Sequence, residues 1–353
     1  MSKDRYGTGE MAHAPVFLEH PSSLHHDTGA HPEQPARITA IARELGQQDW
    51  LAFERVTSPR VARETLTAVH PEGYVAAIER LAERGGAQLD PDTVVSAGSF
   101  DAALHSAGGA VGLVDLLLDR SAPSGFSVHR PPGHHAERAE AMGFCLFNNI
   151  AVAARHAVSA RGLERVLVLD WDVHHGNGTN DIFHSSPDVL FVSIHQSPLY
   201  PGTGPASDVG EGAGVGYTVN LPVPAGAGDD IYRSLVDHVV VPLAHAYEPQ
   251  LLLISAGFDA HRDDPLADCR VTEAGFSAMT ASLRRAGEQL DAPVGAVLEG
   301  GYSLDALARS VAATMATLAA PVPREHPVDA GVAPLAHDAA LRVSRWWPAL
   351  ASL

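Results

Sequence analysis

The sequence is poor in several residue types, and each shortage argues against a class of protein or mechanism. Lys3 is the only lysine among 353 residues, so we expect neither Schiff-base catalysis nor a phosphate-binding loop that depends on lysine. The two cysteines, Cys145 and Cys269, are too few for a disulfide framework, and they favour a reducing, cytoplasmic location.

Long apolar runs and positive charge are scarce as well. No segment approaches the roughly 20 consecutive apolar residues that span a bilayer, and residues 1–15 contain no apolar signal-peptide stretch. We therefore expect no membrane partner. The formal net charge of −18 argues against a nucleic-acid partner and favours the approach of a cationic substrate.

Apolar runs typical of buried strands alternate along the chain with helical patterns. We predict strands at Pro15–Leu18, Gly125–His129, Arg165–Leu169, Val189–Ile194, Tyr217–Val223, Leu251–Ser255 and Val294–Leu298. We predict helices that include Asp101–Leu118, Asn148–Ala160, Asp230–Ala246, Thr272–Leu290 and Leu304–Leu318, with Thr272 and Ser303 placed as caps. This alternation predicts one α/β domain over residues 1–353, with a central, mostly parallel sheet flanked by helices on both faces.

The stretch "LVLDWDVHH" places charged side chains directly after a predicted strand. Asp170, Asp172 and His174 share one parity, so an extended chain would direct them to one side. Carboxylates directed at one point repel each other unless a positive group lies there, and a divalent metal ion is the obvious candidate. Taken alone, the stretch is equally compatible with a polar surface loop.

Polar clusters at three other predicted strand ends favour a common site over a surface loop. His134 and His135 follow the strand before this one, Asp259 follows a later strand, and Tyr302 follows the last. Ligands of parallel sheets bind beyond the carboxyl ends of the strands. We therefore expect these side chains to converge.

The residue types indicate metal-assisted hydrolysis of an amide or ester. Asp172, His174 and Asp259 would provide three ligands and leave positions open for water and substrate, which is typical of catalytic zinc, with ferrous iron as an alternative. A histidine of the "GHH" pair could deprotonate the metal-bound water, and Tyr302 could donate to the carbonyl oxygen. The chain has no G-x-S-x-G motif and no GxGxxG after a strand, so serine hydrolase and dinucleotide-dependent functions lose their main support.

Several long segments closely resemble the zinc-dependent histone deacetylase family. They are "HPEQPARI", "RPPGHHAERAEAMGFCLFNN", "LDWDVHHGNGTNDIF", "SAGFDAHRDDPL" and "LEGGYS". The match is best to class II enzymes and to bacterial histone deacetylase-like amidohydrolases, and it covers roughly residues 15–320. It implies an arginase/deacetylase-type fold, one catalytic Zn²⁺, and removal of an acetyl or related acyl group from lysine side chains.

The resemblance also implies a role for each site residue. The Zn²⁺ ligands would be Asp172, His174 and Asp259. The catalytic group would comprise His135 as general base, His134 as its electrostatic partner, Asp170 behind His134, Asn177 behind the second histidine as in class II, and Tyr302. The substrate-binding group would comprise Gly143, Phe144, Tyr200, Leu266 and Gly301. Tyr200 departs from the phenylalanine that often forms this wall of the tunnel. A structural K⁺ is expected beside Asp170, Asp172, His174, Ser193 and Ile194.

Two alternative functions stay open at this point. An acetylpolyamine or small N-acyl amine deacetylase would use the same site, whereas a catalytically inactive acyl-lysine binding module would lack a ligand or the tyrosine, and this chain has them all. Polyamine-preferring relatives carry a glutamate where this chain has Leu266, so the resemblance favours an acyl-lysine peptide or protein as substrate. Asp263 and Asp264 could partly replace the missing charge. A homo-oligomer is compatible with the sequence.

Overall fold

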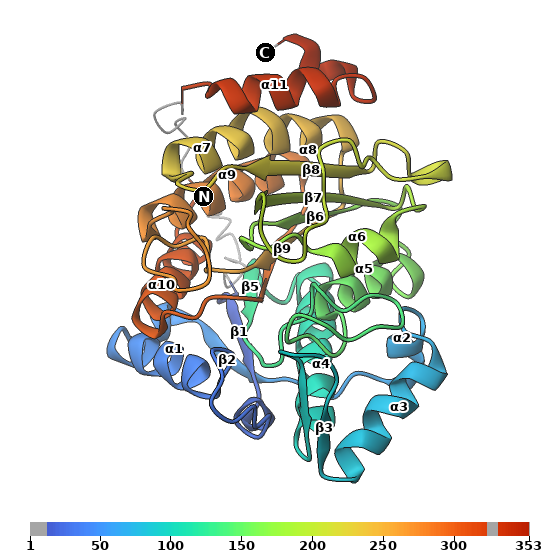
Figure 1. Cartoon of the computed structure of the whole chain (residues 1–353). Helices are drawn as coiled ribbons and strands as arrows, with labels where there is room; N and C mark the ends of the chain where they lie inside the picture. The colour runs from blue at the N-terminus through green and yellow to red at the C-terminus, as the bar shows by residue number, and fades with distance from the viewer. Residues whose placement is uncertain (1–12, 323–330, 353) are drawn as a thin grey trace, which may run out of the picture.

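A computed structural model describes residues 13–322 and 331–352. Eight parallel strands form one sheet in the order β2–β1–β5–β10–β9–β6–β7–β8 (Figure 1). Their bounds are β1 Val16–Glu19, β2 Glu54–Thr57, β5 Ser124–Ser127, β6 Val166–Asp170, β7 Val189–Gln196, β8 Thr218–Val223, β9 Leu251–Ala256 and β10 Val294–Leu298. A separate antiparallel pair consists of β3 Gly86–Gln88 and β4 Val94–Ser96.

The last strand of the sheet in sequence lies at its centre. β10 pairs with β5 on one side and with β9 on the other, so it joins the group β2–β1–β5 to the group β9–β6–β7–β8. Because all the strands are parallel, the carboxyl ends of β5, β6, β9 and β10 meet at one edge. The fold thereby brings together the four strand ends that carry the polar clusters.

Helices cover both faces of the sheet. α4 and α5 lie on one side in Figure 1, and α1, α9 and α10 lie on the other. The helices are α1 Ala36–Gln47, α2 Arg63–Thr67, α3 Glu72–Glu83, α4 Ser99–Leu118, α5 Asn149–Ser159, α6 Asn177–Phe183, α7 Asp229–Leu235, α8 Val241–Tyr247, α9 Glu273–Leu290, α10 Leu304–Ala319 and α11 Pro334–Val343. The structure therefore confirms the predicted single-domain α/β fold with a parallel central sheet.

The β6 sequence shows why its strand is a continuous apolar run. Leu167 and Leu169 pack into the core cluster on the α9 and α10 side, and Val166 and Val168 pack into the cluster on the α4 and α5 side. All four side chains are fully buried. A strand covered on both faces has no polar side to alternate with, which is typical of buried parallel sheets.

α4 needs a separate comment because of its composition. Among the described helices it is the one long and apolar enough to cross a membrane, yet 61% of its most apolar stretch is buried inside the protein. Its buried side chains, which include Leu113 and Leu117, belong to the core cluster that it shares with α5. A core helix meets the same length and hydropathy criteria as a membrane span.

Some local predictions were wrong in detail. The predicted helix Asp230–Ala246 is divided into α7 and α8 by a π-helical turn at Val236–Val240. Thr272 and Ser303 occupy N-cap positions, but neither side chain makes a capping hydrogen bond. The Thr272 hydroxyl instead donates to Asp229 Oδ2 at 2.6 Å, so it links α9 to α7.

Candidate metal and catalytic site

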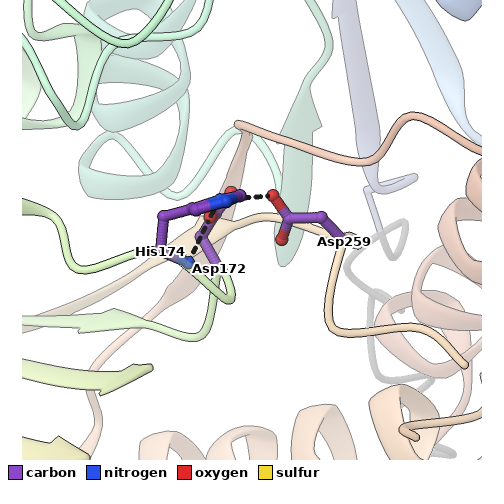
Figure 2. Close-up of side chains that lie close together, drawn as sticks. All are labelled: Asp172, His174 and Asp259. Atoms are coloured by element: carbon purple, nitrogen blue, oxygen red, sulfur yellow. Dashed lines mark hydrogen bonds and ion pairs between the residues drawn. The ribbon is translucent and has the colours of Figure 1, made fainter. Parts of the chain in front are cut away.

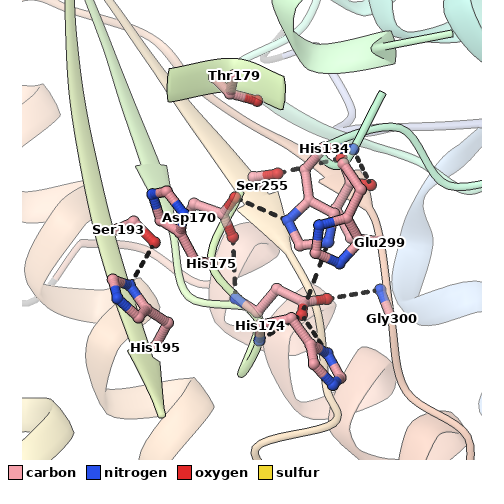
Figure 3. A network of polar contacts seen from close by, with 12 residues as sticks. His134, Asp170, His174, His175, Thr179, Ser193, His195, Ser255, Glu299 and Gly300 are labelled. Atoms are coloured by element: carbon pink, nitrogen blue, oxygen red, sulfur yellow. Dashed lines mark hydrogen bonds and ion pairs between the residues drawn. The ribbon is translucent and has the colours of Figure 1, made fainter. Parts of the chain in front are cut away.

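The metal-ligand candidates follow β6 and β9 at the carboxyl edge of the sheet. β6 ends at Asp170, and the backbone bends over the next residues instead of continuing as an extended strand. Asp170 Oδ1 accepts a hydrogen bond from the Asp172 backbone N–H at 3.1 Å. This bend directs Asp172 and His174 toward Asp259, while Asp170 lies behind them (Figures 2 and 3).

Asp172, His174 and Asp259 form a buried group whose donor atoms lie within 4.8 Å of one another. His174 Nδ1 is 3.2 Å from Asp172 Oδ1 and 3.1 Å from Asp259 Oδ2. Two fully buried carboxylates converge here on one imidazole, an arrangement that is unfavourable without a cation. The donor set therefore fits a divalent metal, and among the described residues no other such group is found.

Backbone groups fix the two carboxylates from behind. Gly300 N–H donates to Asp172 Oδ2 at 2.9 Å, and Val173 N–H donates to Asp259 Oδ1 at 2.9 Å. A Cβ atom at position 300 would lie 2.2 Å from Asp259 Oδ2 and 2.6 Å from Asp172 Oδ2. Glycine is therefore required at this position for the backbone to approach both carboxylates.

The adjacent histidines His134 and His135 have different hydrogen-bond partners, and their pKa values are shifted in opposite directions. His134 Nδ1 donates to Asp170 Oδ2 at 3.0 Å. Burial disfavours its charge, but the carboxylates of Asp172 and Asp170 outweigh burial and raise the pKa of His134 to about 10. A bound cation would offset part of this carboxylate charge. Burial is the largest cause and, together with the positive charge of His134, it holds the pKa of His135 well below its usual value.

The tautomer of His135 follows from the partners of Asn177. The Asn177 Nδ2 group donates to Glu137 Oε1 at 2.8 Å, so its Oδ1 faces His135 Nδ1, also at 2.8 Å. Nδ1 must then carry the hydrogen, which leaves a lone pair on Nε2 of a neutral ring. His135 is thus prepared to accept a proton at Nε2.

A cavity of about 370 Å³ leads to this group of residues. It contains His135 and His174, and of the predicted substrate-binding residues Gly143, Phe144, Tyr200 and Leu266 line it together with Tyr302, whereas Gly301 does not. Lining residues that the sequence did not indicate are His31, Pro32, Pro91, Asp92 and Leu199. They come from three loops, each of which contains a proline, and His31 and Pro32 open the segment "HPEQPARI" that resembles the family.

The cavity wall includes an unusual backbone conformation. Gly143 and Phe144 have φ of +54° and +70°, in the left-handed region, and Phe144 N–H donates to Thr93 Oγ1 at 3.2 Å. The Phe144 ring stands edge-on to Tyr302, with the ring centroids 5.5 Å apart. A phenylalanine held at positive φ costs conformational energy, which is typical of residues positioned for function.

Neither of the two carboxylates expected to replace the missing glutamate lines the cavity. Asp263 is exposed and lies 3.6 Å from Arg309. Asp264 is buried, and its carboxylate accepts hydrogen bonds from the backbone N–H groups of Leu266 at 3.0 Å, Tyr302 at 2.7 Å and Ser303 at 3.2 Å. It therefore positions the loop and cannot replace the missing glutamate. Asp92 is the one carboxylate among the residues that line the cavity.

The residues expected around K⁺ lie beside the metal-ligand candidates. Asp170 of β6 is in register with Ser193 of β7, and both are fully buried. The Ser193 hydroxyl contacts His195 Nδ1 at 2.9 Å (Figure 3). Ile194 follows Ser193 in β7, so the expected potassium ligands adjoin the predicted zinc ligands.

Comparison with known proteins agrees with this geometry. Residues 31–318 match the histone deacetylase domain. The chain belongs to the histone deacetylase family. It is 38% identical over 322 residues to histone deacetylase 14, chloroplastic, from Arabidopsis thaliana, a match that covers 86% of this chain and 76% of the relative. It is 42% identical over 274 residues to the histone deacetylase-like amidohydrolase of Pseudomonas aeruginosa, covering 77% and 72%.

A solved structure of the same family has the same fold. The crystal structure of the HDA15 HD domain superimposes with a TM-score of 0.88 at 36% identity, covering 96% of this chain and 97% of that one. The histone deacetylase and amidohydrolase relatives support a hydrolase that removes acyl groups. The buried Asp–His–Asp group is consistent with the metal dependence of this family.

Proposed function

We propose that this histone deacetylase family member is a zinc-dependent amidohydrolase that removes acetyl or related acyl groups from lysine side chains. The convergence of Asp172, His174 and Asp259 at the cavity that His135 and Tyr302 line carries this proposal. A zinc ion held there would supply a Lewis acid for the amide carbonyl and lower the pKa of water.

The surrounding residues would perform the proton transfers and stabilise charge. His135 Nε2 takes up a proton from the attacking water and later gives it to the departing amine nitrogen. His134, held positive by Asp170, stabilises the negative charge that develops. The Tyr302 hydroxyl donates to the carbonyl oxygen as charge builds on it, because burial raises its pKa well above the usual value and keeps the proton in place.

The cavity walls suit a narrow apolar chain that ends in an amide. Phe144 and Tyr200 would flank the methylene groups of the lysine, with the Gly143 carbonyl near the substrate amide. Leu266 at the mouth adds apolar surface and no charge. We further propose a structural K⁺ beside Ser193 and a reducing, cytoplasmic location for this protein, whose two cysteines are free and buried.

An acetylpolyamine is the second candidate substrate, and Asp92 is the observation that favours it. Burial raises the pKa of Asp92 to about 6, and Asp90 adds to the shift. Because this pKa still lies below 7, the carboxylate is ionised above neutral pH. It could pair with the second ammonium of a polyamine. The acyl-lysine proposal predicts that the apolar surface of Leu266 affects the substrate preference more than the charge of Asp92 does.

Turnover on a substrate panel, together with metal analysis, tests the proposal. Wild-type protein should contain one zinc per chain and hydrolyse acetyl-lysine peptides with a higher kcat/KM than acetylspermidine. Asp259→Ala should lose zinc and activity together, because it removes one of three ligands. Full zinc occupancy in that variant would remove Asp259 from the ligand set, and a tenfold preference for acetylspermidine would establish the polyamine alternative.

A further inference from the structure

A closed ring of buried polar contacts connects the loop of the two histidines to the loop of Tyr302. Its central residue is Glu33, which is fully buried and outside the cavity. Burial disfavours the charge of Glu33, but Arg130 outweighs burial and lowers the pKa of Glu33 to about 2, so the carboxylate is ionised. Two fully buried guanidinium groups, those of Arg37 and Arg130, share this carboxylate.

Arg130 holds the histidine loop. Its Nη2 donates to Glu33 Oε2 at 2.6 Å, its Nε donates to Glu33 Oε1, and its Nη1 donates to the Ser23 carbonyl at 2.8 Å. This bidentate pairing fixes the orientation of the guanidinium group as well as its position. His134 and His135 follow only four and five residues later in the chain.

Arg37 holds the tyrosine loop. Its Nη1 donates to Glu33 Oε1 at 3.1 Å, its Nε donates to the Gly301 carbonyl at 2.7 Å, and its Nη2 donates to the Glu299 carbonyl at 2.5 Å. The guanidinium carbon also lies 5.0 Å from the centroid of the Tyr302 ring. One side chain thus fixes the backbone on both sides of Gly300.

Glu299 closes the ring. Its Oε2 accepts hydrogen bonds from the backbone N–H groups of Gly133 at 2.6 Å and His134 at 3.1 Å, and its Oε1 accepts one from the Ser255 hydroxyl at 3.1 Å (Figure 3). The tyrosine loop therefore contacts the histidine loop directly through Glu299. It also contacts that loop indirectly, through Arg37, Glu33 and Arg130.

We propose that Glu33 is a positioning residue that fixes the histidine loop relative to Tyr302, an inference that rests on the proposed function. Glu33 lies outside the cavity and acts through the two arginines that it holds. The Gly300 N–H contacts one metal ligand, Asp172, but the ligands themselves come from the loops after β6 and β9. A loss of Glu33 therefore loosens His135 and Tyr302 more than it affects metal binding. Misplacement of reacting groups by about 1 Å can lower a rate by roughly 100-fold.

The test compares Glu33→Gln and Glu33→Asp with wild-type holoenzyme on an acetyl-lysine peptide. Glutamine keeps the shape but loses the charge that two guanidinium groups share, and aspartate keeps the charge with a shorter reach. We expect kcat to fall by roughly 10- to 100-fold for Glu33→Gln, less for Glu33→Asp, with KM changed by under about threefold and zinc content unchanged. Arg37→Lys provides a third variant if Glu33→Gln does not fold.

Hydrogen exchange provides a readout that does not depend on turnover. Amides of segments 129–136 and 298–303 should both exchange faster in the Glu33 variants, because the ring holds both loops. Leu235→Ala, which opens a cavity in α7, is the matched control: it should lower stability without lowering kcat.

A folded Glu33→Gln protein with kcat within twofold of wild type would overturn the proposal, as would faster exchange in only one of the two loops. A wild-type enzyme inactive on every acyl-lysine substrate would overturn the proposed function instead. In that case the exchange measurement still decides whether Glu33 couples the two loops.

Discussion

At the residue scale, Tyr302 shows how a common side chain acquires a specific role. Its backbone N–H is held by Asp264, Arg37 lies 5.0 Å from its ring centroid, and its ring packs edge-on against Phe144. Asp264 thus fixes the backbone, Arg37 and Phe144 contact the ring, and Tyr302 lines the cavity that leads to the proposed metal ligands. The hydroxyl is therefore oriented before any substrate arrives.

Tyr302→Phe should leave the fold and the zinc content intact and lower kcat on an acetyl-lysine peptide. Loss of one donor to a developing oxyanion costs roughly 10²–10³-fold in rate, and KM should change much less because the contact forms mainly in the transition state. Steady-state kinetics and elemental analysis check both parts. An unchanged kcat would mean that Tyr302 only forms part of the wall.

Leu266→Glu should shift the substrate preference toward polyamines. The new carboxylate would offer, besides Asp92, a partner for the second ammonium group of a polyamine. A carboxylate and an ammonium about 4 Å apart near a protein surface interact by roughly 4 kcal/mol before desolvation. We expect the ratio of kcat/KM for acetylspermidine over acetyl-lysine peptide to rise at least tenfold. Leu266→Gln, which has a similar shape and no charge, is the control and should leave the ratio close to that of wild type.

The site residues that the sequence could identify are those with a chemical pattern around them. His134, Asp172 and Tyr302 each follow a strand within a recognisable cluster, so the sequence indicates their convergence. Glu137 and Glu299 are single carboxylates whose partners lie 40 or more residues away in the chain. Both lie in segments that resemble the family, and Glu299 directly follows a predicted strand, but a single carboxylate does not indicate which distant groups it contacts, so only the folded structure shows their partners.

At the element scale, the start of α5 joins several parts of the site. The Asn148 side chain accepts a hydrogen bond from the Ala151 N–H at 3.0 Å and donates to the Ala136 carbonyl at 3.2 Å and to Thr179 Oγ1 at 3.1 Å. It is fully buried. This cap therefore attaches α5 to the segments on which the histidine pair and α6 lie.

Asn148→Ala should destabilise the protein by about 2–3 kcal/mol, because it removes a cap and leaves buried polar groups without partners. Ser303→Ala at the start of α10 is the matched control, since Ser303 makes no side-chain capping bond there. It should change the free energy of unfolding by less than about 0.5 kcal/mol. Denaturant unfolding measures both variants, and equal losses would contradict the assigned difference in capping.

The elements that the sequence predicted well are the ones buried on both faces. β6, β9 and β10 are continuous apolar runs, and their predicted bounds agree with the structure to within one residue. β2 was not predicted, because Glu54–Thr57 is an edge strand with mostly exposed side chains and no apolar run. Pairing with β1, and not its own residue pattern, determines its conformation.

At the scale of the whole molecule, buried histidines should make the protein sensitive to acid. Burial is the main cause that lowers the pKa to about 4 for His26, His70 and His195, and to about 3 for His129. The unfolded chain, with pKa values near 6.5, binds these protons more readily than the folded one. Stability is therefore complete above about pH 6.5 and falls as the pH is lowered toward 4.

Each of these histidines contributes up to about 1.4 kcal/mol per pH unit within that window. Denaturant midpoints at pH 7, 6 and 5 should show the decline, and His129→Asn should make it shallower. Replacement of the exposed His337 by glutamine should leave the slope unchanged. A wild-type midpoint that is constant from pH 7 to 5 would contradict this account.

The central position of β10 has a consequence for synthesis on the ribosome. Until residues 294–302 leave the exit tunnel, β5 with the histidine pair and β6 and β9 with the proposed metal ligands belong to separate groups of strands, each with an unpaired edge. A nascent chain that stops before β10 has most of the catalytic side chains but no assembled site. Such chains expose two strand edges that can pair with other molecules, so interrupted translation should yield inactive, aggregation-prone fragments.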